Sequence, residues 1–170
     1  MNKKNCGLKS IFIILATVSL LVCCTGCVVP EGSKVGDKAP DFTLSTLDGG
    51  QVTLSDLKGK PVMLVFWTTG CSACIYQMPF LETAQNEAGA DVEFINIDIG
   101  ESSYQVQAAV DYYGFSLPVA LDSDYSVSDA YNIIYTPTNI IIDRNGIINY
   151  IRKGSFLSAS EILERLDDLE

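Results

Sequence analysis

The sequence predicts an α/β domain built on a central mixed sheet flanked by helices. Two short unbroken apolar runs, 62–67 and 92–97, have the length and composition of strands buried on both faces. Stretches with helical character separate them from later runs, and this alternation favours a sheet with parallel pairs. The turn pair Asn145-Gly146 adds a hairpin, and therefore antiparallel strands. The length of 170 residues suits one domain with one core.

Residues 1–26 are predicted to be a signal peptide outside this domain. They begin with Lys3, Lys4 and Lys9, continue with an apolar run over 11–22, and end in small residues. The apolar run is shorter than the roughly 20 residues of a membrane-spanning helix. An uncleaved N-terminal anchor helix is the alternative, and both interpretations place the domain outside the cytoplasm on a membrane.

Residues 27–37 are predicted to be a short polar tether, and the domain then spans 38–170. Loss of the three leader lysines leaves eight basic residues against 21 acidic ones, a formal charge of −13. Because so acidic a domain repels phosphates, no nucleic-acid partner is expected. The chain contains no His, so the commonest metal ligand and the commonest general base are both absent.

Turn and breaker residues define the elements of the first half. Asp48-Gly49-Gly50 lies between two short apolar stretches, 42–44 and 52–54, which predicts an N-terminal β-hairpin. After the buried strand 62–67, a helix is expected from about residue 74 to residue 87, with a kink at Pro79.

The second half continues the alternation of strands and helices. After strand 92–97, its predicted elements are a helix, a strand, a helix, the two strands of a hairpin and a final helix: 102–113, 117–121, 126–131, 139–142, 147–151 and 158–169. Gly114 ends the first of these helices, and Ser158 or Ser160 caps the last one.

Two cysteines at the junction between strand 62–67 and the next helix indicate the chemistry. Cys71 is placed at the helix N-terminus, where free N–H groups and the helix dipole favour a thiolate. The thiolate is the nucleophile of disulfide exchange. Cys74 follows one turn later and can attack the resulting mixed disulfide. We therefore predict that Cys71 attacks and Cys74 resolves, with no cofactor beyond this redox-active pair.

Two other uses of the pair compete with this prediction. Half of a zinc site would need two more ligands, but the sequence has no second CxxC and no His, so no metal is expected. A purely structural disulfide would close a loop too short to give much entropic stabilisation.

The region around these cysteines resembles the TlpA and ResA group of thioredoxin-like, membrane-bound disulfide reductases. Four residues match the W-x-x-x-C-x-x-C motif of that group and the proline that follows it: Trp67, Cys71, Cys74 and Pro79. The stretch Tyr135-Thr136-Pro137-Thr138 is similar to the group's cis-proline loop. The resemblance covers roughly residues 34–168.

This resemblance implies a thioredoxin-like fold that carries the N-terminal hairpin as an extension and a central helix–strand insertion over 92–102 and 114–131. It also implies a cis peptide bond before Pro137 and pairing of the Thr136 backbone with a bound peptide; an ordinary trans turn is the alternative. The implied electron donor is a membrane thiol carrier of the CcdA or DsbD kind. The implied acceptors are disulfides of extracytoplasmic proteins, with apocytochrome c haem-site cysteines and oxidised repair enzymes both left open.

The segment Cys24-Thr25-Gly26-Cys27 resembles a bacterial lipobox. In that motif a small residue precedes a Cys that receives a diacylglyceryl group, so Cys27 is the predicted lipidation site. Cys24 departs from the motif, where Leu is usual. The resemblance implies a lipid-anchored protein on the extracytoplasmic face of a bacterial membrane.

Proton handling departs from the family pattern at two positions. Val65 stands where thioredoxins usually bury an Asp, and Gln77 stands where many ResA-like proteins have a Glu. An amide can form hydrogen bonds but cannot take the proton of Cys74. Glu101, in the loop after strand 92–97, is the candidate proton acceptor; the alternative is a solvated loop acid. A further departure is Ala73, whose N–H could approach the sulfurs where the family often has proline.

Two other function classes remain open. The stretch 35–57 also resembles the opening of peroxiredoxins, and Thr68 lies three residues before Cys71, but Leu64 replaces the proline of the peroxidase motif. Consumption of peroxide by the reduced chain would indicate a thiol peroxidase. A non-catalytic binding domain on a thioredoxin scaffold is the third class, and it should tolerate Cys71→Ser.

Overall fold

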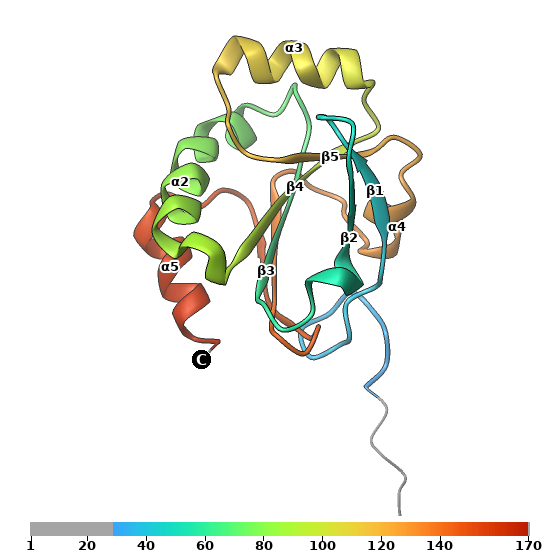
Figure 1. The fold of residues 1–170 in the computed structure, drawn as a ribbon, viewed down its shortest axis with the longest axis vertical. Helices are drawn as coiled ribbons and strands as arrows, with labels where there is room; N and C mark the ends of the chain where they lie inside the picture. Colours follow the sequence, from blue (N-terminus) through green and yellow to red (C-terminus); the bar gives the residue numbers. More distant parts are fainter. Residues whose placement is uncertain (1–28, 170) are drawn as a thin grey trace, which may run out of the picture.

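Seven strands form one mixed sheet in the computed structural model, which describes residues 29–169 (Figure 1). Their order across the sheet is β2-β1-β5-β4-β3-β6-β7. The bounds are β1 Thr43–Thr46, β2 Gln51–Thr53, β3 Val62–Trp67, β4 Glu93–Ile99, β5 Val119–Asp122, β6 Thr138–Ile142 and β7 Ile148–Lys153. β3 lies between its parallel neighbour β4 and its antiparallel neighbour β6. The predicted mixed sheet, with its N-terminal hairpin of β1 and β2, is therefore confirmed.

Helices cover the two faces of the sheet and one of its ends. Their bounds are α2 Ser72–Ala88, α3 Ser103–Tyr113, α4 Ser126–Ala130 and α5 Ala159–Asp167, with short 3-10 helices at Leu54–Leu57 and Gly89–Asp91. α2 and α5 pack together on one face, while α4 lies on the opposite side with β1 and β2 (Figure 1). α3 lies across the end of the sheet. The chain between β4 and β6 forms α3, β5 and α4, in the region of the predicted insertion.

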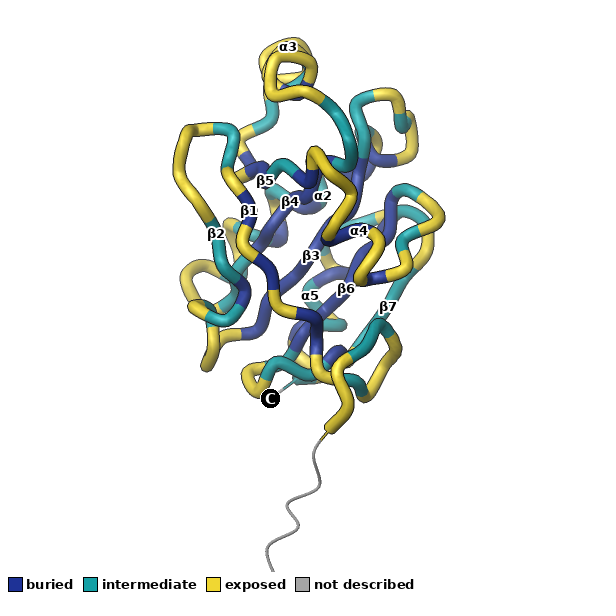
Figure 2. The backbone as a smooth tube through the Cα atoms, turned by 90° about the vertical axis from the view of Figure 1, so that its right-hand side faces the viewer, coloured by how far each residue is buried: buried dark blue, intermediate teal, exposed yellow. Residues whose placement is uncertain are grey.

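The central strand shows why the core has two halves. Side chains alternate along a strand, so Val62, Leu64 and Phe66 join the core on the α4 side. Met63 and Val65 point to the other face and join the core under α2 and α5. All six residues of β3 are buried, in agreement with the continuous apolar run (Figure 2). Burial on both faces therefore holds β3, and the loop that follows it, in place within the sheet.

Local capping explains where the helices begin and end. α3 begins with a capping box in which Ser102 and Gln105 exchange hydrogen bonds, and it ends at Gly114, which adopts the left-handed conformation. Ser158 caps α5, as predicted. α2 begins two residues earlier than expected, because Cys71 rather than a later residue serves as its N-cap. Pro79 lies inside α2, which continues past it to Ala88.

The segment predicted to be a tether is attached to the domain over most of its length. Lys38 N–H donates to Pro30 O at 2.9 Å, and Gly36 N–H donates to Ile148 O at 2.8 Å. A turn closed by the bond from Lys34 N–H to Asp37 Oδ2, at 3.0 Å, supports this path. We call residues 30–38 the N-terminal strap. Its backbone pairs with the start of β7, so it is not a free linker.

The predicted signal peptide, 1–26, and the predicted lipidation site, Cys27, lie outside the described residues. Between residues 29 and 169, no helix combines the length and the apolar character needed to cross a membrane.

Candidate active site

Cys71 and Cys74 lie immediately after the C-terminal end of β3 and form a disulfide, with their Cα atoms 5.2 Å apart. Cys71 is the N-cap of α2, and the Cys74 N–H donates to Cys71 Sγ at 3.1 Å. The donor at this sulfur is thus the Cys74 amide, not the Ala73 amide that the sequence suggested. Cys71 is partly exposed, whereas Cys74 is fully buried. An incoming thiol or disulfide can therefore reach Cys71 more readily than Cys74.

The predicted cis-proline loop lies beside the cysteines. The Thr136–Pro137 peptide bond is cis, as the resemblance implied. Thr138 pairs with Phe66, the residue before Trp67 in β3, which brings the loop to the same end of the sheet as the CxxC motif. Gly154 N–H donates to Pro137 O at 2.8 Å. The loop, the turn after β7 and the start of α2 therefore form one continuous rim.

A pair of buried amides lies beneath this rim. Gln77, on α2, and Asn139, on β6, are both fully buried. Gln77 Nε2 donates to Asn139 Oδ1 at 3.2 Å, and Asn139 Nδ2 donates to Gly154 O at 2.9 Å. Phe156 N–H donates to Gln77 Oε1 at 3.2 Å. Of the two positions that depart from the family pattern, Gln77 is thus part of a neutral amide pair, and Val65 lies opposite its other member, Asn139, in the pairing of β3 and β6.

Replacing Gln77 with Met, which has a similar shape, should lower the free energy of unfolding by about 1–3 kcal/mol. The substitution leaves the Phe156 N–H and the Asn139 Oδ1 without their partner inside the core. Urea unfolding of the oxidised chain, followed by circular dichroism, measures the change. Gln107→Met on the exposed side of α3 is the matched control. Equal stabilities of the two variants would contradict the role given to the amide pair.

Trp67, the last residue of β3, is fully buried and belongs to the same core cluster as Cys74. Its ring meets the ring of Phe115 edge to face, with centroids 6.0 Å apart. In the parallel pairing of β3 and β4, Trp67 lies opposite Asp98. Trp67 therefore packs in the same core as Cys74 and lies opposite a buried acidic residue on the next strand.

Glu101 binds the loop that leads into the CxxC motif. Its Oε2 accepts the Thr69 N–H and its Oε1 accepts the Thr69 hydroxyl, both at 2.6 Å. Gly100, at φ +73°, makes the turn from β4, and a Cβ there would lie 2.3 Å from the Tyr125 ring. Burial alone would raise the pKa of Glu101, but its interactions with the Asp98 side chain and with Thr69 outweigh this and lower it. Glu101 is thus a fixed, partly buried anion rather than a solvated loop acid.

Three residues of this region were not predicted as site residues: Thr69, Asp98 and Asn139. Two of them carry a signal that periodicity could have revealed. Asp98 interrupts an apolar strand. It lies four residues after Phe94, so its side chain points to the same face of the sheet, toward the core under α2 and α5. Asn139 likewise shares the parity of Ile141. A polar residue at a core-facing strand position indicates a buried interaction.

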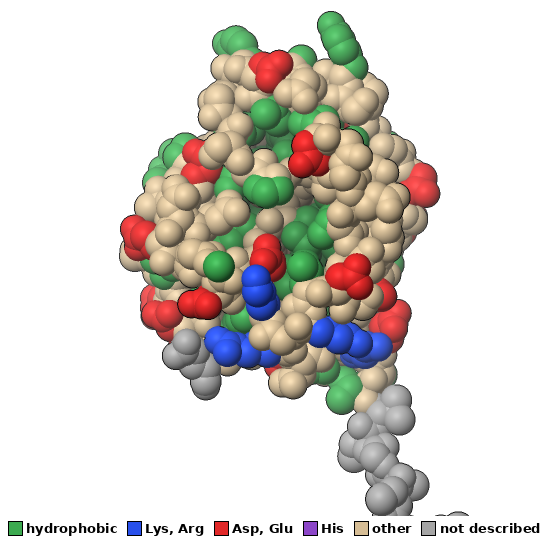
Figure 3. Space-filling model, viewed as in Figure 1, with side chains coloured by type: hydrophobic (Ala, Val, Ile, Leu, Met, Phe, Trp, Pro, Cys, Tyr) green, Lys and Arg blue, Asp and Glu red, His purple; other side chains and the backbone are tan. Residues whose placement is uncertain are grey.

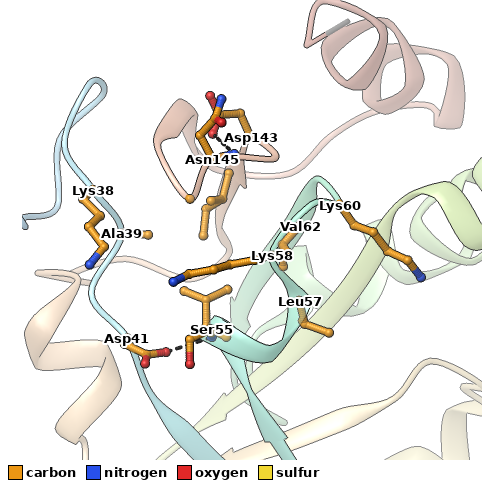
Figure 4. A pocket seen from close by; sticks show the side chains of 13 residues that line it. Lys38, Ala39, Asp41, Ser55, Leu57, Lys58, Lys60, Val62, Asp143 and Asn145 are labelled. Atoms are coloured by element: carbon orange, nitrogen blue, oxygen red, sulfur yellow. Dashed lines mark hydrogen bonds between the residues drawn. The ribbon is translucent and has the colours of Figure 1, made fainter. Parts of the chain in front are cut away.

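A pocket elsewhere in the domain lies at the opposite end of β3 (Figure 4). The strap, the segment before β3 and the turn after β6 contribute lining residues such as Lys38, Lys58 and Asp143. Asp41 accepts the Ser55 N–H at 2.9 Å beside this pocket. Because Val62 begins β3 and the cysteines follow its end, this pocket is separate from the thiol site. Among residues 29–169, no three metal-binding side chains are grouped to hold an ion.

Comparisons with known proteins cover most of the chain. A family model described as Redoxin matches residues 34–166. The thioredoxin-like protein YneN of Bacillus subtilis (strain 168) is 34% identical over 139 residues, which are 80% of this chain and 81% of that protein. The thiol–disulfide oxidoreductase ResA of the same organism is 32% identical over 155 residues, 86% and 87% of the two chains. The crystal structure of the pneumococcal exposed lipoprotein thioredoxin Etrx1, from Streptococcus pneumoniae strain TIGR4, is similar with a TM-score of 0.67 at 32% identity, over 76% of this chain and 100% of that one.

Proposed function

The chain belongs to the redoxin family and is a thiol–disulfide oxidoreductase, and from this premise we propose that it reduces disulfides of extracytoplasmic proteins through Cys71 and Cys74. The observation that carries the proposal is the unequal exposure of the two sulfur-bearing residues. Cys71 is partly exposed at the start of α2, and Cys74 is buried behind it. In this proposal Cys71 attacks the substrate, and Cys74 then releases the product from the mixed disulfide.

The cis-proline rim is the proposed binding site for the substrate polypeptide. Thr136 precedes the cis bond, and its backbone would pair with an extended segment of the substrate beside Cys71. Ile134 and Tyr135, on the same loop, are 75% and 62% exposed and would supply apolar contacts. Acidic side chains are scattered over the face drawn in Figure 3, and the basic ones gather near its lower end. Because Ile134 and Tyr135 are exposed beside the cis bond, apolar contact is the proposed basis of recognition.

The proposed location is the extracytoplasmic face of a bacterial membrane, with the lipid anchor on Cys27. The lipobox-like sequence before Cys27 supports this, and one protein of similar structure is described as an exposed lipoprotein thioredoxin. The proposed electron donor is a membrane thiol carrier of the CcdA or DsbD kind. Apocytochrome c haem-site cysteines are one proposed class of acceptor, and oxidised repair enzymes are another.

The reduction potential of the full chain tests the direction of electron flow. Trp67 is the only Trp and packs in the same cluster as Cys74, so its fluorescence should report the state of the pair. In dithiothreitol or glutathione buffers we expect a two-electron transition at about −250 mV or lower, as for reductants of this class. A potential near about −120 mV would instead make the protein an oxidant that inserts disulfides.

The double variant Cys71→Ser, Cys74→Ser is the control and should show no fluorescence transition. Absence of a transition in the wild-type chain would contradict the proposal and leave a binding domain. Consumption of peroxide by the reduced chain would favour a peroxidase. That activity would need an Arg beside the attacking thiol. Arg152 instead pairs with Glu161, and Arg165 pairs with Asp168. Arg144 lies in the turn after β6, at the end of the sheet where β3 begins.

A further inference from the structure

Asp98 is a buried acidic group that the exchange reaction does not use. Its side chain is 0% exposed, and it lies opposite Trp67 in the parallel pairing of β3 and β4. It shares the parity of Phe94, so it points to the sheet face covered by α2. The carboxyl group therefore lies in the interior, directly behind the loop that carries Cys71.

The surroundings of Asp98 disfavour a negative charge, and only the Glu101 backbone N–H acts against this among the influences on its pKa. Within the described part of the chain, neither of its carboxyl oxygens accepts a hydrogen bond. The charged groups that act on it are Glu101 and Asp122, both acidic. Asp122 is occupied with the N–H groups at the start of α4, and Tyr125 is the other titratable side chain at this turn. An anion at this place would be strongly unfavourable.

Glu101 supplies the missing partner if Asp98 keeps its proton. Glu101 follows Asp98 by three residues, across the turn at Gly100, and the interaction between the two side chains raises the pKa of Asp98 and lowers that of Glu101. Both oxygens of Glu101 already accept hydrogen bonds from Thr69, which marks Glu101 as the anion of the pair. We infer that Asp98 is protonated at neutral pH and donates to Glu101, and that the two groups share one proton in a clamp that positions the active-site loop through Thr69.

The titration behaviour of the two groups supports this geometry. Burial raises the pKa of Asp98 to about 8, and the hydrogen bond and charge of Glu101 act in the same direction. The Glu101 backbone N–H opposes this increase, but it does not reach hydrogen-bond geometry at Asp98. The pKa of Glu101 is lowered, so the pair consists of one acid and one anion at neutral pH.

Loss of the shared proton should release the loop. Above about pH 8 both groups would be charged, and like charges this close repel each other. Glu101 is the more exposed partner and would move, so the Thr69 hydrogen bonds would be lost. Thr69 lies two residues before Cys71, whose own N–H donates to Thr68 O at 3.2 Å. Asp98 and Glu101 are therefore positioning residues for Cys71, a role that rests on the proposed function.

Trp67 fluorescence of the full, oxidised chain tests the clamp without substrate. In this state Cys71 and Cys74 have no thiol to titrate, and ordinary tyrosines ionise near about pH 10. We expect a transition with a midpoint near pH 8 in the wild-type chain. Asp98→Asn, whose amide can still donate to Glu101, should fold normally and lose this transition. Should that variant fail to fold, Glu101→Gln should move the midpoint to lower pH.

Glu82→Gln is the matched control. Glu82 Oε1 accepts the Ser116 N–H at 2.6 Å and the Ser116 hydroxyl at 2.7 Å, so Glu82 holds a loop residue through the same two kinds of donor as Glu101 does. Within residues 29–169, the Glu82 side chain forms hydrogen bonds with Ser116 alone. This variant should keep the transition near pH 8. The inference of a shared proton would be overturned by a transition that persists unchanged in Asp98→Asn, or by the absence of a transition in the wild-type chain.

The alkylation rate of Cys71 in the reduced chain tests the positioning role separately. Above pH 8 the wild-type rate should fall several-fold below that of Asp98→Asn, with the modified Cys identified by peptide mass spectrometry. Identical pH profiles would overturn the link to Cys71. Because the Trp67 titration needs no turnover, it would survive a failure of the proposed reductase function, and a lost clamp would leave the redox transition of the pair intact.

Discussion

Replacing Cys71 with Ser should abolish disulfide reduction, with a loss of more than about a thousandfold in turnover. The hydroxyl of Ser is a far weaker nucleophile than a thiolate at neutral pH, and no other thiol lies within the described domain except buried Cys74. Reduction of insulin disulfides, with dithiothreitol as electron source, measures the effect. Cys6→Ser, in the predicted signal peptide, is the control and should retain full activity.

The complementary variant Cys74→Ser separates the two roles. With Cys71 intact and no resolving thiol, the mixed disulfide with the substrate should accumulate and appear as a covalent complex on non-reducing gels. Cys71→Ser should form no such complex. If instead Cys74 captured the substrate, the assignment of attacking and resolving thiols would be wrong, although the CxxC motif would remain the site.

The second large effect concerns stability, which should fall as the pH rises from about 5 to 7, by up to about 1.4 kcal/mol per pH unit. Burial raises the pKa of Asp98 in the folded state from its ordinary value of 3.8 to about 8. The folded chain therefore holds a proton that the unfolded chain releases. Such a group contributes stability that is fully present below about pH 3.8 and is lost as the pH rises through about 8.

The absence of His makes this window unusually clear, because no imidazole titrates within it. Groups with a lowered pKa, such as Glu101 and Glu161, change their charge only in more acidic solution. Urea unfolding of the oxidised chain at a series of pH values should give a falling stability for wild type and Glu82→Gln. Asp98→Asn should give a flat profile, and a slope that survives in this variant would exclude Asp98 as its source.

Local sequence patterns were sufficient for the elements and for the redox pair. The apolar run of β3, the turn residues of the hairpins and the CxxC spacing each depend on residues close together in the chain. The clamp could not be predicted in the same way, because Thr69 and Glu101 are 32 residues apart and meet only through the parallel pairing of β3 and β4. The Gln77–Asn139 pair spans 62 residues for a similar reason. Sequence reasoning found Glu101 by its place at the sheet edge, but not Asp98, the partner that determines its charge.

If Cys27 carries the proposed lipid anchor, the attachment of the strap sets the distance between the membrane and the cysteines. The strap pairs with the start of β7, near the residue where β3 begins, and the six residues of β3 span about 20 Å. With acyl chains on Cys27, residues 28 and 29 alone would separate lipid from strap. The domain would then hold Cys71 at a fixed distance from the membrane, at the end of the domain farthest from it. A membrane-embedded donor would have to extend its thiols to that level, while passing soluble proteins would meet an unobstructed disulfide.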